Sequence, residues 1–278
     1  MSGKPEADTP RFLAWLYSTP ARQPVLAALC AIEREIGESL RPGADHQVSH
    51  TRLEWWREEC ARCAAGHPAH PLTRELRLHL ERLAPPARVD SVLAGLSGLT
   101  DTATWDLAGA TFERRAEVTA YCRRWAAAMV APLGASEVDW TGFGAALREL
   151  ELLGHLAPDA GRGRIRVPLD ELAAARIAPQ VVATPPWPQE LAGILRGRHQ
   201  ALRQQLAATV AALTPAIQQS DRGLLVWAAL ASQASRRAER ALPREPAVSI
   251  ASAAAANWRA WRVARAAAAG RLRPRAAF

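Results

Sequence analysis

The chain has 278 residues, of which 49% are hydrophobic, and a formal charge of +8 in which Lys4 is the only lysine. This composition excludes a disordered chain, and no uninterrupted apolar run reaches the roughly 18 residues that a membrane-spanning helix needs. The N-terminal residues lack the apolar segment and cleavage site of a secretion signal. We therefore expect a cytoplasmic protein whose four cysteines need not pair.

The positive charge is consistent with attraction to phosphate, whether in a diphosphate substrate, an anionic lipid or a nucleic acid. It is equally consistent with the alanine- and arginine-rich composition of proteins encoded by GC-rich DNA. The sequence has no zinc-finger pattern, no RNA-recognition signature and no alternation of basic with aromatic residues. We therefore expect no nucleic-acid binding.

Apolar residues recur at helical spacing along most of the chain, and no segment shows the alternation of a strand. Residues 1–10 are expected to form a flexible tail. After it the spacing predicts helices over 11–17, 20–40, 49–60, 71–83, 89–107, 117–129, 145–156, 168–172, 188–213, 221–242 and 250–272. The expected N-caps are Thr19, Thr51 or Ser49, and Ser220 or Asp221. Residues 183–188 contain three prolines and indicate a loop.

The stretch over 144–168 carries the most informative motif. An apolar helical run ends at Pro158, and Asp159, the turn Gly161-Arg162-Gly163-Arg164 and an apolar closure at Pro168 follow. This stretch resembles, without a gap, the second acid-rich helix of the squalene/phytoene synthase family. Further resemblances are the R-L-x-W-W-R core over 52–57 and the D-x4-D-L motif over 101–107. The resemblance implies one all-α domain over 11–278, a helical bundle of the isoprenoid synthase type.

Enzymes of that family act in terpenoid biosynthesis and join two prenyl diphosphates head to head, with magnesium held by carboxylates of two facing helices. In this chain Glu151 and His155 stand where the family has its asparagine and aspartate. At the positions where the family's first helix has aspartates, this chain has Gly37, Glu38 and Arg41. The resemblance therefore implies the family's fold but only part of its metal-binding chemistry.

The resemblance leaves few candidate magnesium ligands, and magnesium needs several hard oxygen donors. The candidates are Glu38, Asp101, Asp106 and Asp159. An alternative is that Glu33, Glu35 and Glu38 form a solvated acidic face. Asp101 and Asp106 match the two family aspartates that frame the diphosphate, although a spacing of five does not make them helical neighbours, and the alternative is that they are solvated acids at a helix end. Arginines could hold a diphosphate in place of magnesium, and the candidates are Arg34, Arg41, Arg162 and Arg164.

Residues 117–129 resemble the family's Y-C-x-x-V-A-G helix, so Tyr121 is a candidate catalytic residue near the carbocation, together with Asp101 and Asp106. Trp125 stands where the family has a valine. Its ring would shorten or fill the prenyl tunnel if that face lines the cavity, and would pack in the core otherwise. The expected cavity-lining residues are Trp125, Leu147, Glu151 and His155.

Cys60, Cys63, His67 and His70 offer four possible zinc ligands within eleven residues. Structural zinc sites usually separate their two ligand pairs by a longer loop, so the spacing argues against zinc here.

The helix expected over 250–272 combines Trp258 and Trp261 with Arg259, Arg262 and Arg265. A basic helix of this kind can lie on an anionic membrane surface, which would make the protein membrane-peripheral, or it can dock on its own protein.

We therefore expect a catalytically impaired relative, a pseudoenzyme that keeps a cavity for a prenyl or other lipid-like ligand and acts as a binding or assembly protein. The reason is that ionising an allylic diphosphate requires charge neutralisation by a metal. Two alternatives remain open: an active magnesium-dependent prenyltransferase of the squalene or phytoene type, and a structural scaffold whose cavity is filled by side chains. The sequence does not specify the ligand, the oligomeric state or a protein partner.

Overall fold

The computed structural model describes residues 4–7, 9–41, 43–245 and 251–274, with the backbone only at 251 and 252. These residues form helices and connecting turns, with no strand among them. The α-helices are α1 (Pro10–Tyr17), α2 (Gln23–Gly37), α3 (His46–Ala64), α4 (Pro71–Glu81), α5 (Pro86–Ala94), α6 (Ser97–Leu107), α7 (Arg115–Met129), α8 (Trp140–Gly154), α9 (Leu156–Gly161), α10 (Leu169–Ala174), α11 (Gln189–Ala211), α12 (Pro215–Ser220), α13 (Arg222–Ala241) and α14 (Ala251–Ala268). Three 3-10 turns lie between them, η1 (Glu38–Leu40), η2 (Ala131–Leu133) and η3 (Pro179–Ala183).

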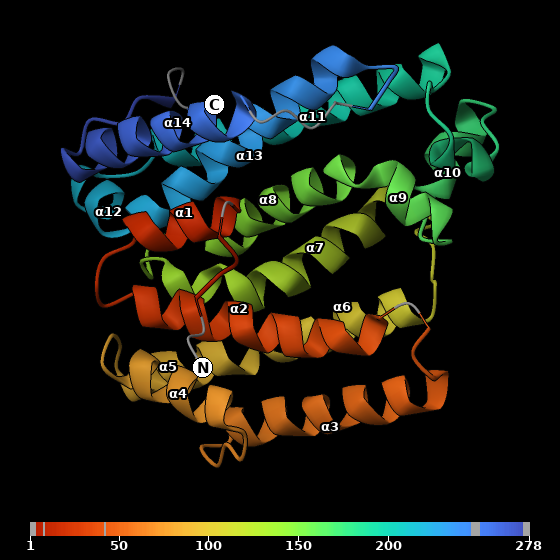
Figure 1. Cartoon of the computed structure of the whole chain (residues 1–278). Coiled ribbons are helices and arrows are strands. Elements are labelled where there is room, and N and C mark those ends of the chain that lie inside the picture. Colours follow the sequence, from red (N-terminus) through yellow and green to blue (C-terminus); the bar gives the residue numbers. More distant parts are fainter. Residues whose placement is uncertain (1–3, 8, 42, 246–250, 275–278) are drawn as a thin grey trace.

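The helices stack in layers (Figure 1). Helices α3, α4 and α5 form one outer side, α2 and α6 lie next to them, α1, α7 and α8 occupy the middle, and α11, α13 and α14 cover the opposite side. The main core runs through these layers, and its largest fully buried side chains include Trp125, Trp140 and Trp227. A smaller apolar cluster, which includes Leu156 and Trp187, lies around α9, η3 and the start of α11. The expected all-α fold is confirmed.

The helix predicted over 89–107 is two helices, α5 and α6, which separate at Gly95 and Leu96. The sequence pattern does not reveal this break, because apolar residues continue through it. The break lets α6 approach α7 at Gly98, where an added Cβ atom would lie only 2.1 Å from the carbonyl oxygen of Arg124. Close backbone approach therefore requires glycine at this position.

We expect Gly98→Ala to lower the free energy of unfolding by about 2 kcal/mol or more, because α6 and α7 must move apart to admit the methyl group. Urea denaturation followed by circular dichroism measures the change. The matched control is Gly193→Ala in α11, where nothing lies within 4 Å of the added Cβ. There we expect a rise of up to about 1 kcal/mol from helix propensity. Equal effects at the two positions would contradict the close approach.

Several helices begin at other residues than the sequence predicted. Helix α2 begins at Gln23, downstream of Thr19. Helix α3 begins at His46 and is capped by Asp45, whose carboxylate accepts from the backbone N–H of the second and third helical residues. Thr51 therefore lies inside α3, where its hydroxyl donates to the carbonyl of Gln47. The prediction was wrong here because apolar periodicity begins only after the first turn of this helix.

Asp221 precedes α13 as predicted, but its side chain makes no capping hydrogen bond. Its buried carboxylate pairs with Arg22 and accepts from the backbone N–H of Ala135 at 2.7 Å. Asp221 therefore joins three distant segments of the chain. A sequence pattern cannot show such a contact.

The chain around the central motif bends twice. Helix α8 ends at Gly154, and Pro158 lies in the first turn of α9, where its missing N–H leaves no hydrogen bond unmade. Gly163 then adopts a φ of +82°, a left-handed conformation that favours glycine. This turn sends residues 164–168 back toward α6 and α7.

The N-terminal residues that the structure describes lie against the bundle. Pro5 is buried, the Lys4 ammonium lies 5.1 Å from the centre of the Trp15 ring, and Thr9 caps α1. Residues 1–3 and 8 of the expected tail, and Ile250 of the expected C-terminal helix, lie outside the described residues. None of the described helices combines the length and apolarity needed to cross a membrane.

Candidate functional site

A pocket of about 690 Å³ is lined by the N-terminal segment and by α1, α2, α6, α8, α9 and the turn that follows α9. Its charged lining residues are five arginines and five acids: Arg11, Arg34, Arg148, Arg164, Arg166, Glu6, Glu33, Asp106, Glu151 and Asp159. The formal charges of the lining therefore cancel, and the pairing of individual groups decides what the pocket can bind.

On one side of the pocket, Arg11 of α1 joins two acidic residues. Its guanidinium pairs with Glu33 of α2 and lies 3.1 Å from the Glu151 carboxylate of α8. Arg148 also approaches Glu151, at 3.0 Å. Burial alone would raise the pKa of Glu151, but Arg11 and Arg148 outweigh it and hold that pKa below its ordinary value. Glu151 is therefore ionised and already neutralised by two arginines.

On the other side, Arg166 lies between two carboxylates. Its Nη1 donates to Asp106 Oδ1 at 2.7 Å, and its Nε donates to Asp159 Oδ2 at 2.9 Å. The Tyr121 hydroxyl donates to the second oxygen of Asp106 at 3.0 Å. Arg166 is only 4% exposed, so solvent does little to weaken these charge-assisted bonds. The Asp106–Arg166–Asp159 bridge links α6 to the turn after α9.

These residues do not fit the magnesium cluster that the family resemblance implies. Magnesium requires a near-octahedral shell of oxygen ligands. Asp106 and Asp159 are both hydrogen-bonded to Arg166, whose fixed positive charge repels a cation at the same place. Within the part of the chain that the structure describes, no group of three or more His, Cys, Asp or Glu side chains is arranged to hold a metal ion.

The sequence model of the family described as squalene/phytoene synthase matches residues 4–262. The chain belongs to the squalene/phytoene synthase family. Among solved structures, a dehydrosqualene synthase in complex with ligand is similar with a TM-score of 0.73 and 14% identity over 92% of each chain. The squalene synthase HpnC from Alicyclobacillus acidocaldarius is similar with a TM-score of 0.63 and 17% identity, over 82% of this chain and 87% of that one. No curated protein sequence matches. At these identities the structures show the shared helical fold, and the expected family is confirmed.

The pocket brings together six of the residues proposed from the squalene/phytoene synthase resemblance. These are Arg34, Asp106, Glu151, His155, Asp159 and Arg164. Arg34 and Arg164 have no ion-pair partner among the residues that the structure describes, so their guanidinium groups are available to an anion.

Four of the proposed metal- or diphosphate-binding residues lie outside this lining. Glu38 and Arg41 pair with each other around η1. Asp101 is half-buried on α6 and shares none of the partners of Asp106. Arg162 is exposed on the turn after α9. The spacing of five along α6 therefore separates the two aspartates of the family motif rather than joining them.

Trp125 and Leu147 belong to the core rather than to the pocket lining. Trp125 is 1% exposed, and its ring centre lies 6.0 Å from that of Trp227. Its Nε1 donates to Glu33 at 2.8 Å, and the Arg148 guanidinium lies 5.1 Å from its ring centre. The structure thus places the Trp125 ring in the packed interior and outside the pocket lining. Because Glu33 and Arg148 line the pocket, the Trp125 ring fills the protein interior next to the pocket wall.

Sequence reasoning missed Arg11, Glu33 and Arg148 as pocket residues. Of the three acids in the alternative of a solvated face, only Glu35 and Glu38 pair with surface arginines, whereas Glu33 lines the pocket. The helical spacing of Arg148 and Glu151 could have indicated an internal pair on one face of α8. Nothing in the sequence marks Arg11, because its partners lie far away along the chain.

Three of the four candidate zinc ligands have other roles. Cys60 and Cys63 are buried thiols, and burial raises the pKa of Cys63 to about 11. His70 caps α4 by accepting from the backbone N–H of Leu72 at 3.2 Å, and its ring packs against Trp56. Cys60, Cys63 and His70 are thus accounted for by the local fold, and His67 is exposed.

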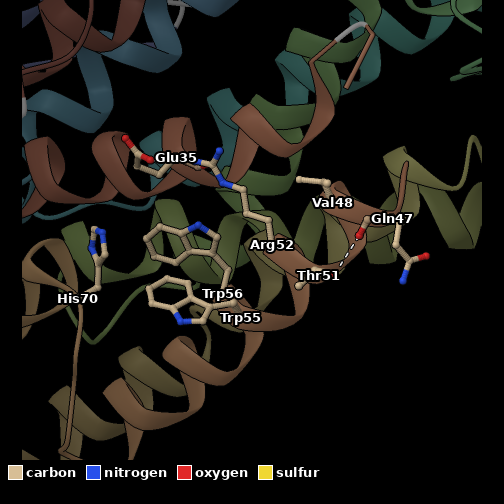
Figure 2. Close-up of a pocket in the computed structure, with 8 residues that line it drawn as sticks. All are labelled: Glu35, Gln47, Val48, Thr51, Arg52, Trp55, Trp56 and His70. Atoms are coloured by element: carbon tan, nitrogen blue, oxygen red, sulfur yellow. Dashed lines mark hydrogen bonds and ion pairs between the residues drawn. The ribbon is translucent and has the colours of Figure 1, made fainter. Parts of the chain in front are cut away.

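A second pocket, of about 530 Å³, lies beside the R-L-x-W-W-R core of α3 (Figure 2). Trp56 is buried and Trp55 is 41% exposed, as expected for adjacent residues on a helix. Figure 2 shows both indoles in the pocket wall, with Arg52 extending toward Glu35, to which it is bonded at 3.0 Å. Glu35 is the only acid among the described residues of the lining and is already paired with Arg52, so we assign no catalytic role to this pocket.

Proposed function

We propose that this squalene/phytoene synthase-like protein binds the anionic head of a prenyl or other lipid-like ligand in its central pocket, without magnesium and without prenyl transfer. The observation that carries the proposal is the Asp106–Arg166–Asp159 bridge. Arg166 forms ion pairs with the two carboxylates that, by the family resemblance, would bind metal in an active relative.

The charge balance of the pocket argues against catalysis. Expelling diphosphate from an allylic carbon requires positive charge that can neutralise the leaving group. The charges of Arg11, Arg148 and Arg166 are already neutralised by acidic partners. An arginine held in such a pair supplies little additional positive charge to a leaving diphosphate. The site is therefore better suited to binding than to ionisation.

Arg34 and Arg164 are the proposed contacts of the ligand head group. They lie on α2 and on the turn after α9, and both line the same pocket. Guanidinium groups bind phosphate oxygens through paired, charge-assisted hydrogen bonds. The pocket volume falls in the range of small-molecule sites, roughly 300–1,000 Å³.

Calorimetric titration with farnesyl diphosphate, in the presence of magnesium and then of a chelator, tests the proposal. We expect binding of equal strength in both conditions and no release of pyrophosphate. The double variant Arg34→Gln/Arg164→Gln should bind about a hundredfold more weakly or worse, since hydrogen bonds to charged groups contribute roughly 1.5–3 kcal/mol each. Arg162→Gln, on the exposed neighbouring turn, is the matched control and should bind like the wild type.

Binding that strengthens with magnesium, accompanied by pyrophosphate release, would instead establish an active prenyltransferase. Absence of binding in both conditions would favour the scaffold alternative. That alternative has its own support in Trp125, because the ring fills the interior directly behind the pocket.

A further inference from the structure

The outward face of α14 carries two exposed tryptophans. Trp258 is 59% exposed and Trp261 is 39% exposed. Their rings stack on each other, with centroids 4.8 Å apart and an interplanar angle of 23°. Together they form one apolar patch on the protein surface, which leaves a large aromatic area in water.

These tryptophans do not hold α14 on the protein. The opposite face of the helix does so, through the buried residues Ala260, Val263, Ala264 and Ala267. This face packs against α13, α1 and α12, and α14 lies on the outer layer of the bundle (Figure 1). Docking on its own protein therefore leaves the tryptophan face of α14 open.

The same outward face is basic. Arg262 and Arg265 are exposed, and the Arg265 guanidinium lies 5.4 Å from the centre of the Trp261 ring. Residues 246–278 contain no aspartate or glutamate. Arg236 of α13 adds further charge nearby: the pKa of Arg259 is lowered by burial and by the repulsion of Arg236 and Arg262. The tryptophan patch is thus accompanied by positively charged side chains.

We propose that the face of α14 formed by Trp258, Trp261, Arg262 and Arg265 binds the surface of an anionic lipid bilayer. Indole rings prefer the headgroup region of a bilayer, and arginines beside them would contact lipid phosphates. A second copy of the chain is a poorer occupant, because it would bring equally basic surfaces together. The proposal does not depend on the function of the central pocket.

Co-sedimentation of the full chain with vesicles tests this surface. We expect binding to vesicles of equimolar phosphatidylcholine and phosphatidylglycerol, and little binding to phosphatidylcholine alone. The double variant Trp258→Ser/Trp261→Ser should bind the anionic vesicles about tenfold more weakly, and Arg262→Glu/Arg265→Glu at least as weakly. Because all four side chains are exposed, we expect both variants to fold. Trp55→Ser removes an exposed tryptophan from α3 and is the matched control.

Equal binding to both kinds of vesicle, or unchanged binding of the two double variants, would overturn the proposal. Light scattering of the protein without vesicles tests the alternative that a second copy of the chain binds this face. A dimer that dissociates in the Trp258→Ser/Trp261→Ser variant would show that a second copy, not a bilayer, covers this face.

Discussion

Replacing Arg166 by methionine is expected to lower the free energy of unfolding by about 3–5 kcal/mol. The substitution keeps most of the side-chain volume but leaves the carboxylates of Asp106 and Asp159 without their shared partner. Removal of one member of a buried ion pair has an effect of this size, because the remaining charge stays desolvated. Asp106 would keep only its hydrogen bond from Tyr121 among the contacts described above. Urea denaturation at neutral pH measures the change.

The same variant tests the conclusion about metal. With Arg166 gone, the two carboxylates face each other without a cation, and a divalent ion can partly replace the guanidinium. We expect magnesium chloride to raise the stability of Arg166→Met and to leave the wild type unchanged, because only a ligand that binds the folded state stabilises it.

The matched control for this substitution is Arg162→Met, four residues earlier on the exposed turn, which should change the stability by no more than about 0.5 kcal/mol. If Arg166→Met were as stable as Arg162→Met, the bridge would contribute nothing to the fold. If magnesium stabilised the wild type, the native site would hold metal after all.

Acidification is expected to destabilise the protein through His199. This side chain is 3% exposed, and its Nδ1 lies 2.9 Å from the hydroxyl of Ser235. Burial, and after it the positive charge of the nearby Arg203, lower its pKa from 6.5 to about 4, although Glu239 acts in the opposite direction. Arg203 also donates to the same Ser235 hydroxyl at 2.8 Å. The folded protein therefore holds His199 in its neutral form.

The sign of the pH effect follows from proton binding. As the pH falls below 6.5, the unfolded chain protonates His199 while the folded protein, with a pKa of about 4, does not. Stability is therefore lost as the pH falls from 6.5 to about 4, and the loss from this residue approaches about 3 kcal/mol at about 1.4 kcal/mol per pKa unit. Urea unfolding across that range measures it.

His199→Gln is the control, because other groups titrate in the same range. The lowered pKa values of Glu59, Glu151 and Glu239 also make the wild type less stable in acid. We expect the unfolding free energy of the variant to depend less steeply on pH than that of the wild type. Parallel curves would show that His199 does not titrate in this way.

The sequence determined the class of fold and most of its helices. Apolar residues at helical spacing and the ordered motifs of 52–57, 101–107 and 144–168 were enough to identify the squalene/phytoene synthase family, because these signals are local along the chain. Local signals also explain the errors. The cap at Asp45 depends on hydrogen bonds that its side chain accepts from the backbone, and the break before Gly98 allows a close approach to the backbone of Arg124. Hydrophobic periodicity reflects neither of these contacts.

Only the tertiary structure decided how the charged side chains of the pocket pair. The motifs marked Asp106 and Asp159, but the arginine that joins them, and the pairing of Arg11 with Glu33 and Glu151, depend on residues far apart in the chain. The tertiary structure also placed the Trp125 ring in the core and left Arg34 and Arg164 of the pocket without an ion-pair partner among the described residues. The physical reason is that helix formation is dictated by neighbouring residues, whereas the charge available to a ligand depends on which side chains meet when distant helices pack.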